Sequence, residues 1–250
     1  MRKLFVIYYL FCIAILSMLF GAGCSQEQSY EKRLGQNERT MNQAVEENPK
    51  LPYVMLIGDS ISSGYTDPVR KLLAGKANVY RPLKPDETVK IGGPITIGLE
   101  FLDKWLGDKK WDVIHFNWGL HDMKYVDEKG EMTSPEKGRQ QVPIEDYEKN
   151  LEELVNRLKK TGAILIFATT TPVPEGAFGR VKGDAERYNA VAVKVMRKNG
   201  VIIDDLYSFA LPRLKEIQKE RDVHYTEDGY QLLGEQVASS ILKALEQRGR

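Results

Sequence analysis

The stretch that decides the fold reads Tyr53-Val54-Met55-Leu56-Ile57-Gly58-Asp59-Ser60-Ile61. Its first five residues are continuously apolar, as in a β-strand that is covered on both faces. The apolar run stops at Gly58-Asp59-Ser60 and gives way to a helix-like stretch. This order predicts a serine hydroxyl at the carboxyl end of a parallel sheet, the edge at which open α/β sheets carry their reactive groups.

Apolar runs and amphipathic segments alternate along the rest of the chain. Further strands are predicted over residues 77–80, 112–117, 163–169 and 201–204, and helices over residues 68–74, 98–106, 144–160, 184–198 and 226–247. Strands that alternate with helices indicate a three-layer α/β/α sandwich with a parallel sheet of about five strands. About 200 residues, from 51 to 250, are enough for one domain with a full core.

The N-terminus has the pattern of an export signal. Arg2 and Lys3 precede an apolar stretch over residues 4–20, and Gly21-Ala22-Gly23-Cys24 follows it. This end resembles a bacterial lipobox, with Gly21 where leucine is usual, which implies that residues 1–23 are removed and that Cys24 carries lipid. The alternative is an uncleaved spanning anchor. Either interpretation predicts an exported domain held at a membrane, in the periplasm or at the cell surface.

Charge and cysteine content exclude several classes of function. Removing residues 1–23 takes away two of the 36 basic residues and none of the 35 acidic ones, so 34 remain against 35, a balance that argues against a nucleic-acid partner. The only cysteines are Cys12, in the signal, and Cys24, so no disulfide or thiol nucleophile is expected in the domain. Residues 24–50 are predominantly polar and are predicted to form a tether.

A serine near the start of the domain and a histidine near its end suggest a nucleophile and its base. Ser60 follows the first predicted strand, and His224 lies in a polar loop before the last predicted helix. Of the other two histidines, His115 lies within an apolar strand and is predicted to be a core residue.

At these residues the sequence resembles the GDSL/SGNH hydrolase superfamily. Its blocks correspond in order to Gly58-Asp59-Ser60-Ile61, the loop Ile91-Gly92-Gly93-Pro94, the stretch Asn117-Trp118-Gly119-Leu120-His121-Asp122, and Asp222-Val223-His224. The resemblance implies a flavodoxin-like sandwich and a cofactor-independent esterase. It also implies that Ser60 is the nucleophile and His224 the base.

The resemblance leaves the acid of the site open. The family usually has aspartate three residues before the histidine, where this chain has Arg221. Asp222, two residues before, is the nearest substitute, because residues i and i+2 of an extended loop point to the same side. One alternative is that Glu220 is the acid. The other is a serine–histidine dyad in which a backbone carbonyl orients the imidazole.

The oxyanion donors are also carried over from the family. The backbone N–H of Ser60 is one, and a glycine of the later loop is the second, with Gly93 favoured over Gly92. The third is an asparagine in the family, but His121 stands in its place here. A neutral imidazole can donate the same hydrogen bond, and Asn117 is the competing donor.

Two other segments lie near these blocks. The polar loop 127–141 follows the third block and is predicted to border the substrate cleft, and Arg187-Tyr188-Asn189 resembles a helix segment of the superfamily with either a surface or a structural role. No metal-ligand spacing or phosphate-binding glycine loop is evident, so neither a metal nor a cofactor is expected.

The sequence therefore predicts a serine esterase that hydrolyses small acyl esters, acetyl esters of carbohydrate being the first expectation by analogy. A lipase or lysophospholipase is the alternative within the same class. A non-catalytic glycan-binding or envelope-assembly module and an acyltransferase are the alternatives from other classes.

Overall fold

The computed structural model describes residues 47–82 and 92–248. Five parallel strands form the main sheet in the order β2-β1-β3-β6-β7, and every strand end lies within one residue of its predicted position. The strands are β1 (Tyr53–Ile57), β2 (Asn78–Tyr80), β3 (Val113–Phe116), β6 (Ile164–Ala168) and β7 (Ile202–Asp204). The predicted parallel sheet is thus confirmed.

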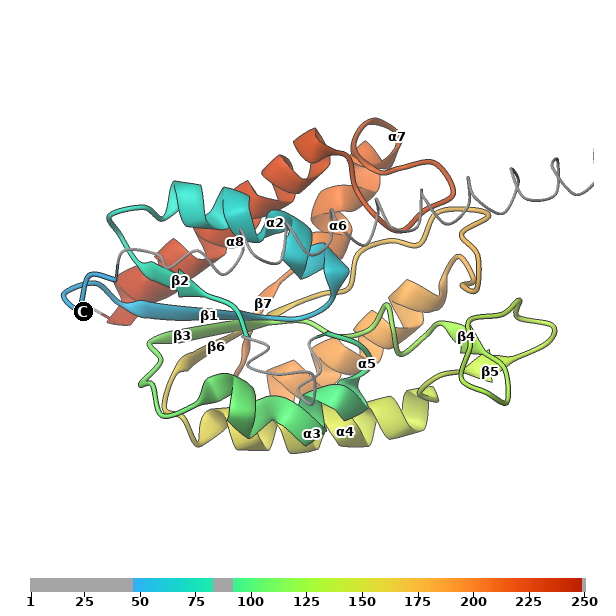
Figure 1. The fold of residues 1–250 in the computed structure, drawn as a ribbon, viewed down its shortest axis with the longest axis horizontal. Helices are drawn as coiled ribbons and strands as arrows, with labels where there is room; N and C mark the ends of the chain where they lie inside the picture. Colours follow the sequence, from blue (N-terminus) through green and yellow to red (C-terminus); the bar gives the residue numbers. More distant parts are fainter. Residues whose placement is uncertain (1–46, 83–91, 249–250) are drawn as a thin grey trace, which may run out of the picture. The chain divides into compact units, whose positions relative to one another are not determined.

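Helices cover both faces of the sheet (Figure 1). One face carries α2 (Ser60–Leu72) and α8 (Glu227–Arg248), and the other carries α3 (Ile95–Leu106), α4 (Ile144–Lys159) and α5 (Asp184–Lys198). Apart from Tyr53 and Ile164, which are partly buried, the apolar side chains of the three central strands, β1, β3 and β6, are almost completely buried between these layers. The expected three-layer α/β/α sandwich is confirmed.

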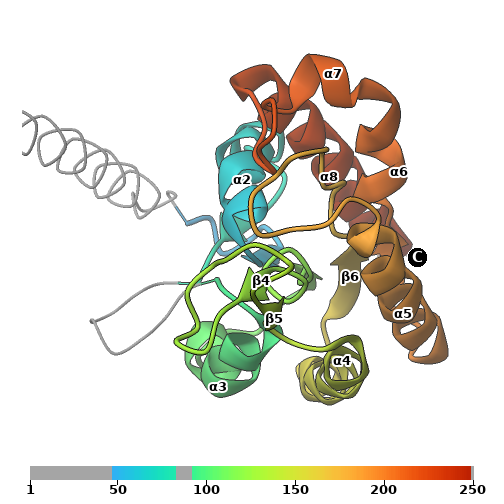
Figure 2. The same ribbon diagram turned by 90° about the vertical axis from the view of Figure 1, so that its right-hand side faces the viewer.

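The strand order reverses at one point of the sheet. Counted along the chain, the five strands lie in the order 2-1-3-4-5, which is the flavodoxin-like order. The order reverses between β1 and β3, and ligands of such sheets bind outside the carboxyl ends of the strands at that point. Gly58 follows β1 and Asn117 follows β3, so both motifs lie at this switch point, on the edge that faces the viewer in Figure 2.

The helix after Ser60 is longer than predicted. The sequence predicts a helix over 68–74, whereas α2 runs from Ser60 to Leu72 and contains Pro68 in its interior. Residues 60–67 include three serines, a glycine and a threonine, which are weak helix formers. Packing on α8 overrides this preference: a Cβ built on Gly64 would lie 2.1 Å from the Tyr230 ring, so the two helices are in close contact.

Several short elements are not predicted from the sequence. Helices α6 (Leu206–Ala210) and α7 (Leu214–Ile217) flank a 3-10 turn, η1 (Leu211–Arg213), between β7 and α8. The polar loop predicted over 127–141 is closed at its base by a small antiparallel pair, β4 (Tyr125–Val126) with β5 (Arg139–Gln140). Each is too short to leave a periodic pattern.

Residues 47–50, which the sequence assigns to the tether, contact the domain. The Glu47 carboxylate accepts hydrogen bonds from the hydroxyls of Tyr80 at 2.6 Å and Tyr53 at 2.7 Å and pairs with Lys109 at 3.2 Å. These hydrogen bonds, that of Tyr80 first, lower the pKa of Glu47 to about 2. The amide of Asn78 holds the Asn48 carbonyl oxygen at 2.8 Å.

The predicted signal, residues 1–23, and Cys24 lie outside the described residues. Within 47–82 and 92–248, no helix has both the length and the apolar character needed to cross a membrane.

Candidate active site

A two-residue turn presents Ser60 at the switch point. β1 ends at Ile57 and α2 begins at Ser60. The Asp59 carboxylate accepts a hydrogen bond from the Ile61 N–H at 3.0 Å and so caps the helix. Position 58 has no room for a side chain, because a Cβ there would lie 1.9 Å from the Asn117 Oδ1 atom. Asp59 is 3% exposed whereas Ser60 is exposed, so a fixed turn offers the serine hydroxyl to solvent.

The structure brings Ser60, His224 and Asp222 together in one hydrogen-bonded chain. The Ser60 Oγ atom lies 2.8 Å from His224 Nε2, and His224 Nδ1 lies 2.8 Å from Asp222 Oδ1. An ionised carboxylate can only accept, so Nδ1 carries the proton and Nε2 is free to accept the serine proton. Partial burial opposes ionisation of Asp222, but the hydrogen bonds from the backbone N–H and ring of His224 lower its pKa. Asp222, not Glu220, therefore contacts the histidine.

A tight loop explains how an acid two residues before the histidine reaches its ring. Arg221 has φ of 55°, a left-handed conformation that is uncommon for a residue with a side chain. The chain reverses there, and Asp222 Oδ1 accepts a hydrogen bond from the His224 backbone N–H at 3.1 Å as well as from the ring. Arg221, at the position where the family usually has aspartate, thus forms the turn that delivers Asp222.

Gln218 ties this loop to the segment after β6. Its side-chain amide donates to the carbonyl oxygens of Pro172 at 2.9 Å and Val223 at 3.3 Å. The Lys219 N–H donates to the His224 carbonyl oxygen at 2.9 Å. These contacts fix both ends of the histidine loop.

The described glycines of the predicted oxyanion loop lie beside the serine turn. Gly92 and Gly93 have φ of 73° and 90°, conformations that favour glycine. A Cβ on Gly92 would lie 3.6 Å from the Gly58 carbonyl oxygen, whereas one on Gly93 would face Ile97 at 3.3 Å. Gly92 thus lies directly over the serine turn, with Gly93 next to it at the start of α3.

Asp122 joins this glycine loop to the third block. Its buried carboxylate accepts a hydrogen bond from the Ile95 N–H at 2.8 Å, at the N-terminus of α3. Its second oxygen is buried without a partner, and burial raises the pKa of Asp122 to about 7. Asp122 therefore holds the start of α3, and the glycines before it, against the loop that carries His121.

His121 and Asn117, the two candidates for the third oxyanion donor, differ in exposure. His121 is half-buried, whereas Asn117 is 5% exposed and packs against Gly58. Burial lowers the pKa of His121 and so favours the neutral imidazole. The negative charge of Asp59 acts in the opposite direction but is the smaller effect. The position of His121 is therefore the more accessible of the two to a substrate.

Helix α5 supports the loop that contains Gly119 and His121, through contacts with Thr170. The Asn189 amide bonds both the N–H and the carbonyl oxygen of Thr170, each at 2.8 Å. Thr170 in turn packs against Gly119, where a Cβ would lie 2.8 Å from the threonine side chain. The Tyr188 hydroxyl donates to the Val142 carbonyl oxygen at 2.6 Å. Of the two roles left open for the segment 187–189, these contacts establish the structural one.

His115 lies in the core, as predicted. It is 0% exposed, and its Nε2 atom lies 3.2 Å from the Asp204 carboxylate, while Nδ1 has no hydrogen-bond partner. Within 47–82 and 92–248, no group of three or more histidine, cysteine or acidic side chains is arranged to hold a metal ion.

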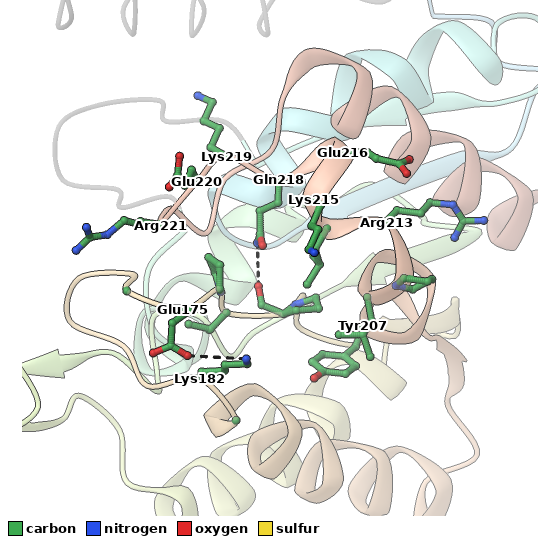
Figure 3. A pocket seen from close by; sticks show the side chains of 18 of the residues that line it. Glu175, Lys182, Tyr207, Arg213, Lys215, Glu216, Gln218, Lys219, Glu220 and Arg221 are labelled. Carbon is green, nitrogen blue, oxygen red and sulfur yellow. Dashed lines mark hydrogen bonds and ion pairs between the residues drawn. The ribbon is translucent and has the colours of Figure 1, made fainter.

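A cavity of about 1230 Å³ lies beside the histidine loop (Figure 3). The segment 172–176, α6–α7 and residues 218–221 contribute to its walls, whereas Ser60, Asp222 and His224 do not. Tyr207 and several prolines supply apolar surface, while Glu175 and Lys182 form an ion pair at 3.8 Å. The cavity therefore lies next to the histidine loop without including these three residues, and its lining is mixed apolar and charged.

Two cations near the site carry no sequence motif. Arg180 donates from Nε to the Leu120 carbonyl oxygen at 2.9 Å, directly before His121. Lys124 follows His121 by three residues, and both positive charges act on the pKa of that histidine. Arg180 lies about sixty residues away in sequence and is brought here only by the fold, so no spacing rule finds it.

An exposed serine, hydrogen-bonded to histidine at the switch point of a flavodoxin-like sheet, defines a class of hydrolase. The model of the GDSL-like Lipase/Acylhydrolase family matches residues 56–232, more than half of the chain. The chain belongs to this family and is a carboxylic ester hydrolase.

Solved structures share the fold at low sequence identity. A lipase/acylhydrolase from Enterococcus faecalis superposes with a TM-score of 0.61 at 20% identity, over 76% of this chain and 95% of that one. An acetyl xylan esterase has a TM-score of 0.59 at 17% identity, over 76% of this chain and 99% of that one. An acetylxylan esterase from Geobacillus stearothermophilus has a TM-score of 0.59 at 17% identity, over 76% of this chain and 94% of that one. A search of curated proteins gives no match.

Proposed function

We propose that the protein is a serine esterase that removes small acyl groups, acetyl first, from carbohydrate through a covalent acyl-enzyme. The observation that carries the proposal is the chain from Ser60 through His224 to Asp222, with both contacts at 2.8 Å. Such a chain supplies a nucleophile, its base and the group that orients the base.

The proposed reaction has two half-reactions. The Ser60 Oγ atom attacks the ester carbonyl carbon while His224 Nε2 takes its proton, and Asp222 stabilises the imidazolium that forms. The tetrahedral intermediate expels the alcohol, which takes the proton from His224, and leaves an acyl ester on Ser60. Water then attacks this ester with His224 as its base, and the acid is released.

Three groups are proposed to stabilise the oxyanion. They are the Ser60 backbone N–H, the backbone N–H of one glycine of the pair Gly92-Gly93, and the His121 ring. Of the two glycines, Gly93 is favoured as the donor. A lowered His121 pKa supports this role, because the neutral ring offers an N–H without adding a second proton source. The 5% exposure of Asn117 favours His121 over Asn117.

Carbohydrate is proposed as the alcohol component because acetyl xylan esterases are among the proteins of similar fold. The cavity beside the histidine loop is lined by neither Ser60 nor His224, so it is not assigned to the substrate.

The test is a substrate series on the full chain in detergent. p-Nitrophenyl esters from acetyl to long acyl chains, acetylated xylo-oligosaccharides and a lysophospholipid are compared at matched concentration, with Ser60→Ala as the blank. We expect the highest kcat/KM for acetyl esters and release of acetate from the sugars. A preference for long chains or the lysophospholipid would instead favour the lipase alternative.

We also propose that the domain works outside the cytoplasm, held to a membrane by lipid on Cys24. The support is the order of basic, apolar and small residues before Cys24 in the sequence. Cys24→Ser should move the protein from the membrane fraction to the soluble fraction. A variant that stays with the membrane would favour the spanning anchor.

A further inference from the structure

Arg180 and Lys124 are two cations beside His121 that contact no carboxylate in the part of the chain that the structure describes. Both side chains are half-buried, and neither forms an ion pair with any described residue. Burial lowers the pKa of each, so the fold places them at a cost to their charged forms.

The acids in electrostatic range of these cations are committed elsewhere. Asp59 and Asp222 act on Arg180, but Asp59 caps α2 and Asp222 bonds His224. Asp122 acts on Lys124, but it holds the Ile95 N–H and its pKa is raised to about 7. Within residues 47–82 and 92–248, no acid therefore neutralises either cation by direct contact.

Other cations of the domain show the contrast. Lys194 and Lys198 pair with glutamates of α4 at 2.8 and 2.7 Å, and Lys182, two residues after Arg180, pairs with Glu175. These three exposed cations have carboxylate partners among the described residues, whereas Arg180 and Lys124 do not. A half-buried charge without a counter-ion is costly, and an anionic ligand removes that cost.

Arg180 is anchored so that part of its guanidinium remains available. Its Nε donates to the Leu120 carbonyl oxygen at 2.9 Å, and its described contact through Nη1 is to the Met132 sulfur, at 3.9 Å. Sulfur is a weak acceptor, so the outer edge of the guanidinium keeps donors for a stronger one. A guanidinium fork matches carboxylate and phosphate oxygens in particular.

We propose that Arg180 and Lys124 bind an anionic group, a carboxylate or a phosphate, on the substrate of this esterase. The inference rests on the proposed function, since it assigns a substrate class to the same site. An acetyl group has no atoms for a second charge, so the anion belongs to the alcohol component. The substrate class is then an acylated acidic sugar or an acylated phosphate ester.

Matched substrate pairs test this on the full chain. An O-acetylated methyl glucuronide is compared with the corresponding acetylated methyl glucoside, and acetyl glycerophosphate with glycerol monoacetate. We expect the wild type to prefer the anionic member of at least one pair by about tenfold or more in kcat/KM. This preference should become smaller at high salt, because salt screens the attraction between the charges. The pair with the larger ratio identifies the anion.

Variants then separate charge from loop structure. Arg180→Gln and Lys124→Gln should each lower kcat/KM more on the anionic member of a pair than on its neutral member, and so remove most of the preference. Arg180→Lys should keep part of it, and the control Lys182→Gln, which loses a cation that is already paired, should keep all of it. Equal loss on charged and neutral substrates would mean that Arg180 only shapes the Leu120 loop, and would overturn the inference.

The outcome also distinguishes the two proposals. A wild type that hydrolyses the neutral esters with no anionic preference contradicts the inference and leaves the esterase proposal standing. A wild type that hydrolyses none of the four substrates contradicts both.

Discussion

Replacing Asp222 with asparagine tests how His224 is oriented. In many serine triads this change is severe, because the new amide group donates and so favours the wrong imidazole tautomer, at a cost of ~10⁴ in kcat. The present geometry differs. A single oxygen, Asp222 Oδ1, accepts both the backbone N–H of His224 at 3.1 Å and the ring Nδ1–H at 2.8 Å.

The amide oxygen of asparagine can take the place of that one atom. The backbone N–H then holds the amide with its oxygen toward the ring, so Nδ1 keeps its proton and only the charge is lost. Charge-assisted hydrogen bonds are roughly twice as strong as neutral ones, so the loss is about 1–2 kcal/mol, or about 5- to 30-fold in kcat. The side chains of His224 and Asp222 are 39% and 44% exposed, and solvent screening favours the lower part of this range.

The assay is kcat on p-nitrophenyl acetate, with circular dichroism to check folding. Asp222→Ala removes the acceptor of both bonds and should cost about 10²- to 10³-fold, well beyond Asp222→Asn. Glu220→Gln, at an exposed neighbour without contact to His224, serves as control. An asparagine variant as inactive as the alanine variant would refute the shared-oxygen argument, and two silent variants would show that the imidazole needs no acid.

Three further predictions concern residues around the site. His121→Ala should lower kcat about 10²-fold on p-nitrophenyl acetate with little change in KM, whereas an unchanged kcat would exclude it as an oxyanion donor. The folded-state pKa of Asp122, about 7, lies above its usual 3.8, so its contribution to stability is fully present below about pH 4 and is lost as pH rises through 7. Asp122→Asn should remove this fall in the free energy of unfolding, which is at most about 4 kcal/mol, as measured by urea unfolding between about pH 4 and pH 7. A variant whose unfolding free energy falls with pH as steeply as that of the wild type would contradict this. Gly98→Ala should lower the unfolding free energy by about 1–2 kcal/mol, because a Cβ there would lie 2.5 Å from the buried Trp118 ring, and a more stable variant would show that the core yields.

The sheet could be predicted because its signal is local. A strand buried on both faces is continuously apolar, and residues 53–57 and 163–169 have that pattern. The start of helix α2 could not be predicted, because its first residues have weak helix propensity. They become helical only because Gly64 packs against Tyr230 on α8. Pro68, which suggests a helix start, lies in the helix interior.

The site shows the same division between local and distant signals. Ser60, His224 and Asp222 lie in short motifs, so the sequence identifies all three. The left-handed turn at Arg221 that delivers Asp222 has no signature in residue type, since such turns usually carry glycine or asparagine. Arg180 reaches the site from a loop between β6 and α5 through its bond to Leu120, a contact that only the fold creates.

In the proposed reaction, Ser60 becomes acylated with His224 as its base. Rapid mixing with a chromogenic acetyl ester, followed by acid quench and peptide mass spectrometry, measures this directly. We expect an initial burst and an added acetyl mass on the peptide that contains Ser60. We expect neither in Ser60→Ala, and acylation slowed by about 10³-fold or more in His224→Ala. Turnover that persists in folded Ser60→Ala, or an acetyl group on another residue, would contradict it.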